Sequence, residues 1–168
     1  MTVISFTTKE TAAQMRKALR EAFPATKFSV RMSRGTGYGW FDLTWADGPS
    51  TTQVQQVTDR FRDQRFDSMS DSYVPVEARL YAVEDHEMPV LIEYSCSGAN
   101  GSRTFSPEAR AWAAAVIRAA WPEVDTAGWT TCPVALLGEI ALTHPHGDLD
   151  GHVHEFLNRV GDLTGRQF

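Results

Sequence analysis

Hydrophobic positions near the start of the chain follow a helical spacing between two short stretches of strand-like alternation. Residues 2–6 are a strand candidate. Thr7 and Glu10 are spaced as in a capping box, so a helix is expected to begin beside them. Its apolar stripe has spacings of three and four residues and ends before Pro24, which cannot continue the helical hydrogen bonding. The stripe consists of Met15, Ala18, Leu19, Ala22 and Phe23.

The segment after this helix predicts a hairpin and a second helix. Residues 28–32 and 41–45 alternate between apolar and polar side chains, as strands with one buried face do. Residues 34–39, Arg-Gly-Thr-Gly-Tyr-Gly, connect them and are rich in glycine, which tolerates positive φ. Apolar residues at helical spacing then predict a helix over about 51–62.

The second half of the sequence has a similar order of patterns. Residues 88–94 alternate as a strand, and Ser106-Pro107 is typical of a helix start with proline at the first position. The apolar stripe over 113–121 lies 98 residues after the first stripe, and residues 142–160 align with 43–61 at a shift of 99. We therefore predict a tandem duplication with the order βαββα in each copy.

These patterns together predict an α+β fold, in which an antiparallel sheet is covered on one face by about four helices. The expected units are residues 1–75 and 76–168, packed into one globule because so small a unit buries only a modest core alone. Residues 66–73 are expected to form a polar turn, and residues 74–80 one more strand. Residues 97–103 are expected to be a surface loop.

The composition is that of an ordinary globular domain and changes this picture little. The chain has 168 residues, of which 42% are hydrophobic and 22% charged. It contains no run of about 18 apolar residues, so we expect a cytoplasmic protein without a membrane partner. Cys96 and Cys132 form no CxxC pair, which favours reduced thiols over a disulfide. No pattern links either cysteine to a histidine and an acid, so a catalytic thiol is not favoured.

The formal net charge of -5 is unevenly distributed. Up to Asp63 there are nine basic and six acidic residues, and the remainder has seven arginines and fifteen acids. A mildly basic first half favours contact with a polyanion, whereas the acidic remainder repels one. The whole chain is therefore no generic nucleic-acid binder, and its negative charge is also too dilute for a protein that imitates DNA.

The N-terminal half contains several unusual short strings in a fixed order: Ala22-Phe23-Pro24, residues 27–31, Ser33-Arg34, residues 43–49 and residues 66–73. In these strings the chain resembles a known family, the large polyvalent protein associated domain 29. The resemblance covers about residues 8–75. It implies a role in the biology of phages or other mobile elements, such as protecting incoming DNA or engaging host factors. It implies no catalytic residues.

Basic and aromatic residues around the glycine-rich hairpin are one candidate binding site. Guanidinium groups for phosphates and aromatic faces for stacking are what proteins use to bind single-stranded nucleic acid. The alternative is an ordinary hairpin whose aromatic residues cover the edge of a sheet. The candidates are Arg31, Arg34, Tyr38 and Trp40 at the hairpin, with Arg16, Lys17 and Arg20 on the exposed side of the first helix.

A dense group of histidines and aspartates near the C-terminus is a candidate metal site. His144, His146, Asp148 and His152 are of the types that bind zinc or another divalent metal. The alternative is a solvated turn followed by a helix, because the aligned turn in the first half has no such group. In that helix His152 is expected to point away from the buried face.

We therefore predict a non-enzymatic binding protein of a phage or other mobile element, with no cofactor. Its partner is expected to be a host protein, such as a defence factor, or nucleic acid. The alternative function is a metal-dependent hydrolase that uses the C-terminal histidines and aspartates.

Overall fold

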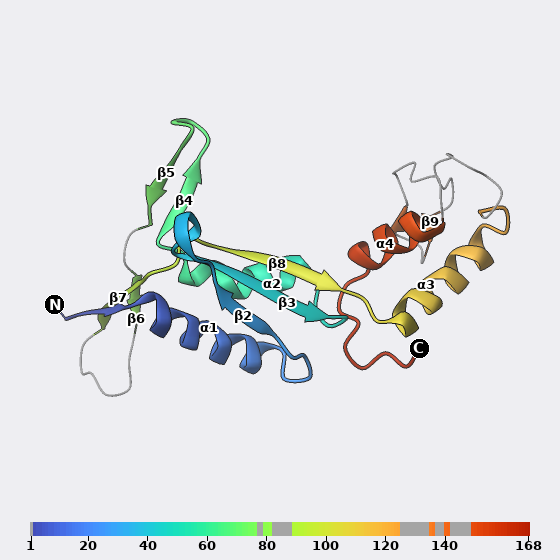
Figure 1. The fold of residues 1–168 in the computed structure, drawn as a ribbon, viewed down its shortest axis with the longest axis horizontal. Helices are drawn as coiled ribbons and strands as arrows, with labels where there is room; N and C mark the ends of the chain where they lie inside the picture. Colours follow the sequence, from blue (N-terminus) through green and yellow to red (C-terminus); the bar gives the residue numbers. More distant parts are fainter. Residues whose placement is uncertain (1, 77–78, 82–88, 125–134, 137–139, 142–148) are drawn as a thin grey trace. The chain divides into compact units, whose positions relative to one another are not determined.

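The structure, a computed structural model, describes residues 2–76, 79–81, 89–124, 135–136, 140–141 and 149–168 (Figure 1). Over these residues the fold is α+β, with four α-helices and both mixed and antiparallel sheets. The helices are α1 (Thr8–Ala22), α2 (Thr51–Thr58), α3 (Pro107–Ala120) and α4 (Leu149–Arg159), with short 3-10 helices η1 (Gly35–Gly37) and η2 (Asp59–Phe61). The strands are β1 (Val3–Phe6), β2 (Ser29–Met32), β3 (Trp40–Ala46), β4 (Gln64–Asp67), β5 (Ser72–Pro75), β6 (Arg79–Tyr81), β7 (Val90–Tyr94), β8 (Gly98–Thr104), β9 (Ala135–Leu136) and β10 (Ile140–Ala141).

The chain separates into two compact units. The first consists of Met1–Thr44 and Thr52–Ser102, and the second of Trp45–Thr51 and Arg103–Phe168. The sequence-based boundary after residue 75 falls directly after β5, within the first of these units. No helix in the part of the chain that the structure describes is long and apolar enough to cross a membrane.

Four sheets are formed by the described strands. One has the order β1-β7-β6, with β1 parallel and β6 antiparallel to β7. A second has the order β2-β3-β8, and β2 is antiparallel to β3. The pairs β4-β5 and β9-β10 are antiparallel. The sheets are thus mixed rather than one antiparallel sheet, because β1 and β7 run in the same direction.

Helix α1 begins and ends where its sequence predicts. The Thr7 hydroxyl accepts the Glu10 backbone N–H at 3.4 Å, and the Glu10 carboxylate accepts the Thr7 N–H at 2.8 Å, which completes the capping box. The helix is capped at Phe23, whose N–H donates to Leu19 O at 2.9 Å. Met15, Ala18 and Leu19 of the predicted stripe are buried, with Met15 and Leu19 at 0% exposure, whereas Ala22 is exposed and Phe23 is half-buried at the end of the helix.

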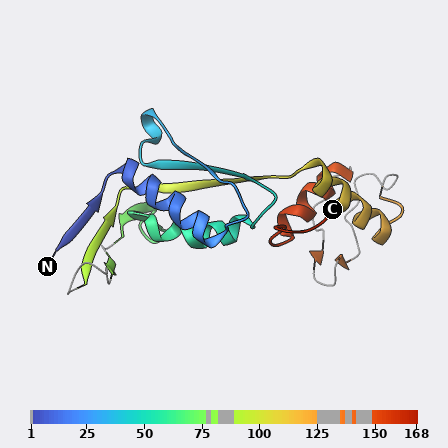
Figure 2. The same cartoon turned by 90° about the horizontal axis from the view of Figure 1, so that it is seen from below.

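Helices α1 and α2 lie on the same side of β3 (Figure 2). Phe41 and Leu43 point to this side and are buried together with Val54 of α2 and Val30 of β2. Side chains that alternate with them along a strand belong to the other face of the sheet. We call this face, made by the outward residues of β2, β3 and β8, the uncovered face.

Two stretches differ from their predicted structure. Residues 66–73 were expected to form only a turn, yet they belong to the hairpin β4-β5, in which Phe66 and Tyr73 are paired with ring centroids 5.4 Å apart. The expected loop over 97–103 is wrong, because these residues form β8. The strand consists mostly of glycine and polar residues, so its sequence lacks the alternation of apolar and polar side chains that predicts a strand.

The second unit is built around the packing of α3 on α4. Helix α3 starts as predicted, since the Ser106 hydroxyl accepts the Ala109 N–H at 3.1 Å and Pro107 occupies the first turn. The core contains Ala109, Ala113, Ile117, Val153, Phe156 and Leu157. The tandem βαββα duplication is not confirmed: β7, expected to open the second copy, pairs with β1 in the first unit instead.

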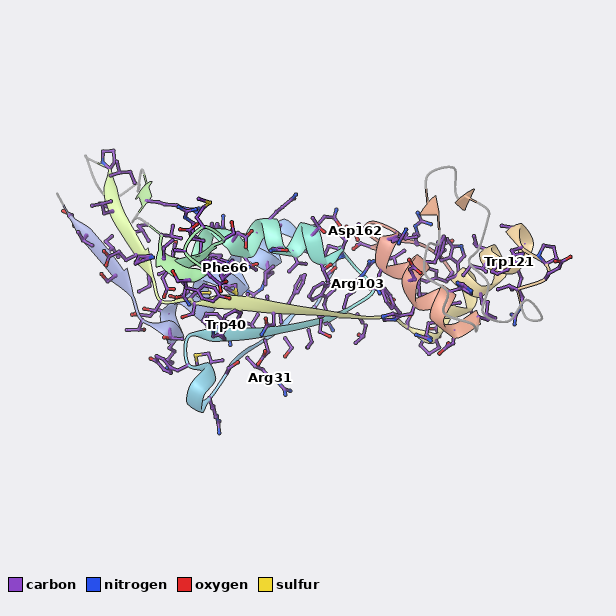
Figure 3. The ribbon with its side chains drawn as sticks, turned by 90° about the horizontal axis from the view of Figure 1, so that it is seen from above. Arg31, Trp40, Phe66, Arg103, Trp121 and Asp162 are labelled. Atoms are coloured by element: carbon purple, nitrogen blue, oxygen red, sulfur yellow. The ribbon has the colours of Figure 1, made fainter. Side chains whose placement is uncertain are left out.

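Arg103 is the main polar group in the interior of this second unit. Its side chain is 7% exposed, and its guanidinium donates hydrogen bonds of 2.7–3.1 Å to five backbone carbonyls. The acceptors are the carbonyl oxygens of Asp47, Gly48, Leu157, Val160 and Gly161. Burial lowers the pKa of Arg103, and Asp162 and Asp47 oppose that shift. Figure 3 labels Arg103 and Asp162.

Candidate functional site

The uncovered face carries two of the residues predicted to bind a partner. Arg31 is exposed in β2, and its cross-strand neighbour in β3 is Asp42. Trp40 alternates with the buried Phe41, so it belongs to the same face as Asp42. Figure 3 shows Arg31 and Trp40, which lie on neighbouring strands. The structure therefore brings a guanidinium and an indole to one side of the sheet.

The indole of Trp40 rests on the backbone of β8. A Cβ atom added to Gly98 would lie 2.5 Å from Cζ3 of Trp40 and 2.8 Å from Cε3 and Cη2, so only glycine leaves room for the ring. This contact fixes the plane of the indole, which is partly exposed. Gly98 is a residue that sequence reasoning missed, although a glycine near an aromatic position of a paired strand is the signal that would have found it.

Further polar groups lie on the same face of the sheet as this aromatic ring. Asn100 and Ser102 alternate with Gly98 along β8, and both are exposed. Asp42 is the one carboxylate at the paired positions of β2 and β3, and it accepts a hydrogen bond of 2.9 Å from the Ser33 hydroxyl. The face is thus polar, with one fixed aromatic platform.

The hairpin between β2 and β3 holds Arg34 and Tyr38. Arg34 is exposed directly before η1, and Tyr38 is 75% exposed. The Thr8 hydroxyl donates to the Tyr38 hydroxyl at 3.3 Å, which ties the hairpin to the start of α1. Within the described residues neither Arg31 nor Arg34 forms an ion pair, so neither guanidinium has a carboxylate that a partner would need to displace.

The candidate cations of α1 lie apart from this group. Arg16 donates from Nη2 to the Val30 carbonyl at 2.7 Å and so joins α1 to β2. Lys17 pairs with Glu21 at 3.9 Å, with both side chains largely exposed. Arg20 is exposed in the last turn. Because α1 lies on the covered side of the sheet, the structure divides the predicted set between two surfaces.

Most of the predicted metal site lies outside the described residues. His144, His146 and Asp148 fall in the part that the structure does not describe. His152 is described, and the expectation that it points away from the buried face is wrong: it is 1% exposed and meets Trp121 edge-on with centroids 5.4 Å apart. Trp121, just after α3, packs against His152, so the buried side of α4 includes this residue as well as its apolar stripe. Elsewhere in the described chain no three His, Cys, Asp or Glu side chains are grouped to hold a metal.

Cys96 is buried and unsuited to nucleophilic chemistry. It is a free cysteine with 0% exposure. Burial, with the nearby Asp63 carboxylate, raises the pKa of its thiol to about 12, so the thiol stays protonated near neutral pH. The Cys96 N–H donates to the Asp63 carboxylate at 3.0 Å, and burial raises the pKa of Asp63 as well. Cys132 lies outside the described residues.

A comparison with protein families matched the chain to one family model. The family model "Large polyvalent protein associated domain 29" matches residues 6–106, which is more than half of the chain. The chain belongs to this family. The match to the polyvalent protein associated domain extends beyond the resemblance over residues 8–75 and runs from the end of β1 through β8 to the cap of α3. The uncovered face therefore lies within the family domain, which suggests an association with a phage or another mobile element. Searches of curated proteins and of solved structures gave no significant match.

Proposed function

We propose that this protein is a non-enzymatic accessory protein of a phage or other mobile element that binds single-stranded nucleic acid through the uncovered face. The observation that supports this is the indole of Trp40, held over Gly98 beside exposed guanidinium groups that have no ion-pair partner among the described residues. Arg31 and Arg34 would contact phosphates, and the Trp40 ring would stack on a base.

The charge distribution supports weak and salt-dependent binding rather than tight, general binding. The whole chain has a net charge of -5, so only the local surface favours a polyanion. Each stacked base is worth about 1–3 kcal/mol, and each neutralised phosphate adds a salt-dependent increment. Asp42 would oppose a phosphate bound near Arg31. Protection of an incoming strand is the role in mobile-element biology that such binding fits.

The proposal is tested by fluorescence anisotropy with a labelled oligothymidylate and a labelled oligouridylate at low salt. Trp40→Ala is expected to weaken binding by about tenfold, from the loss of one stacked base. Arg31→Glu should weaken binding further and make it less dependent on salt concentration, because one phosphate contact is lost, whereas Asp42→Asn should strengthen binding. Arg20→Glu is the matched control, because it makes the same charge change on α1 and should have a smaller effect.

The outcomes separate the alternatives. Equal losses for Arg31→Glu and Arg20→Glu would show that only net charge matters, and the uncovered face would be rejected. Absence of binding to both oligonucleotides at low salt would also overturn the proposal and leave a host protein as the partner to be sought.

A further inference from the structure

A second place in the first unit combines a cavity, aromatic rings and cations. The cavity has a volume of about 250 Å³ and is lined by residues of β1, β6, β7 and the segment that follows α2. None of these residues belongs to the uncovered face. They come from four separate parts of the sequence, which is why no motif indicates the site.

The floor of the cavity is one face of the β1-β7-β6 sheet. Phe6 pairs with Tyr94 across β1 and β7, and Arg79 of β6 pairs with Ile92. Because side chains alternate along a strand, these four residues share one face. The Phe6 and Tyr94 rings are stacked at 5.3 Å between centroids with 18° between their planes, and Phe61 meets Tyr94 edge-on at 4.8 Å. The aromatic part of the floor is therefore held in a fixed orientation.

Three arginines line the cavity, and two of them have no carboxylate partner among the described residues. Arg62 is paired, with Nε 2.9 Å from the Asp59 carboxylate. Arg60 lies over the Phe61 ring, with Cζ 4.9 Å from the centroid. Among the described residues neither Arg60 nor Arg79 forms an ion pair with a carboxylate. Two guanidinium groups thus line the cavity without an acidic partner.

The two acidic residues of the lining do not neutralise these guanidinium groups. Asp63 is turned to the backbone, where its carboxylate accepts the Cys96 N–H at 3.0 Å. Glu93 alternates with Ile92 and Tyr94, so its side chain belongs to the opposite face of the sheet, where it accepts the Ser5 hydroxyl at 2.9 Å. With three arginines and two acidic residues, the lining keeps a formal excess of one positive charge.

We infer that this cavity binds the phosphate group of a ligand of nucleotide size, with Arg60 and Arg79 on the phosphate and the base packed against the Phe6–Tyr94 floor. A phosphate monoester carries a charge of about -1.5 to -2 near neutral pH, which two guanidinium groups match, whereas a single carboxylate would leave one of them unpaired. The volume lies just below the usual range of ligand pockets, about 300–1,000 Å³, and so favours one nucleotide over a larger molecule.

Isothermal titration with adenosine 5′-monophosphate tests the inference, with adenosine as the ligand that lacks only the phosphate. Arg60→Gln and Arg79→Gln should each weaken binding of the monophosphate by about tenfold or more. Arg65→Gln is the matched control, because Arg65 is exposed in β4 and does not line the cavity. A broadened or shifted phosphorus resonance of the monophosphate with the unaltered protein gives a readout that does not depend on the variants folding.

Equal affinity for adenosine and its monophosphate would overturn the inference, as would equal effects of Arg79→Gln and Arg65→Gln. The source of the phosphate follows from two oligonucleotide arms, one with a 5′-phosphate and one with a 5′-hydroxyl. Stronger binding of the phosphorylated strand than of the monophosphate would assign the site to strand ends, and the reverse to free nucleotides. The inference is separate from the proposed function, because Arg31→Glu should leave binding of the monophosphate unchanged.

Discussion

Replacing Arg103 by methionine tests what holds the second unit together. Methionine has a similar length and no hydrogen-bond donor, so the change removes the guanidinium and leaves five backbone carbonyls without it. Each hydrogen bond to a charged donor is worth about 1.5–3 kcal/mol, and such contributions are not additive. A buried carbonyl left without a donor costs about 1–3 kcal/mol, and because these costs are not additive we expect a total loss of about 3–5 kcal/mol in unfolding free energy.

Arg103→Lys separates charge from geometry. Lysine keeps the positive charge but has three donors on one nitrogen, which cannot reach carbonyls that surround a planar guanidinium. We therefore expect Arg103→Lys to lower the unfolding free energy, but by less than Arg103→Met does. Arg110→Met is the matched control, because Arg110 pairs with the largely exposed Asp150, and a surface pair is worth about 0–1 kcal/mol.

Urea unfolding followed by tryptophan fluorescence measures these differences, and amide hydrogen exchange locates them. The Leu163 N–H donates to the Gly48 carbonyl at 2.9 Å, beside the guanidinium, and should lose protection in Arg103→Met while amides of α1 keep theirs. If Arg103→Met lowers the unfolding free energy no more than Arg110→Met does, the five hydrogen bonds add no net stability over hydrogen bonds to water. That result would refute the reasoning.

Three further predictions concern local features of the first unit. Thr7→Ala should lower the unfolding free energy by about 1 kcal/mol, because the Thr7 hydroxyl caps α1, and should bring the low pKa of Glu10 back toward its ordinary value in an NMR titration; an unchanged pKa would contradict the capping box. Gly98→Ala should shift the fluorescence of Trp40 and destabilise the fold by about 1–3 kcal/mol, since the new Cβ would meet the indole; an unchanged spectrum would show that the ring does not rest there. Cys96 should resist iodoacetamide at pH 8 in the native protein and react only after unfolding or as the pH rises toward its pKa of about 12, measured by peptide mass spectrometry; rapid native labelling would contradict its burial.

The elements that the sequence predicted correctly are those whose signals are local. The capping box of Thr7 and Glu10 and the Ser106-Pro107 start of α3 depend on residues within one helical turn. The alternation in β3 likewise reflects which side chains one face of a sheet buries, whereas in β2 only Val30 is buried and Met32 is 44% exposed. Arg31 and Trp40 could be chosen as candidates from local sequence too, because both lie next to the glycine-rich hairpin.

Tertiary structure alone decided the rest, because the partners are distant in sequence. The sequence does not show strand β8, in which Gly98 makes room for the ring of Trp40. Arg103 was predicted to lie in a surface loop, whereas in the structure backbone carbonyls of residues 47–48 and 157–161 surround its guanidinium. The cavity lined by Arg60 and Arg79 also joins four separate segments. A sequence pattern records which side chains prefer burial, but hydrogen bonds to backbone carbonyls and close approaches to glycine depend on where other parts of the chain lie.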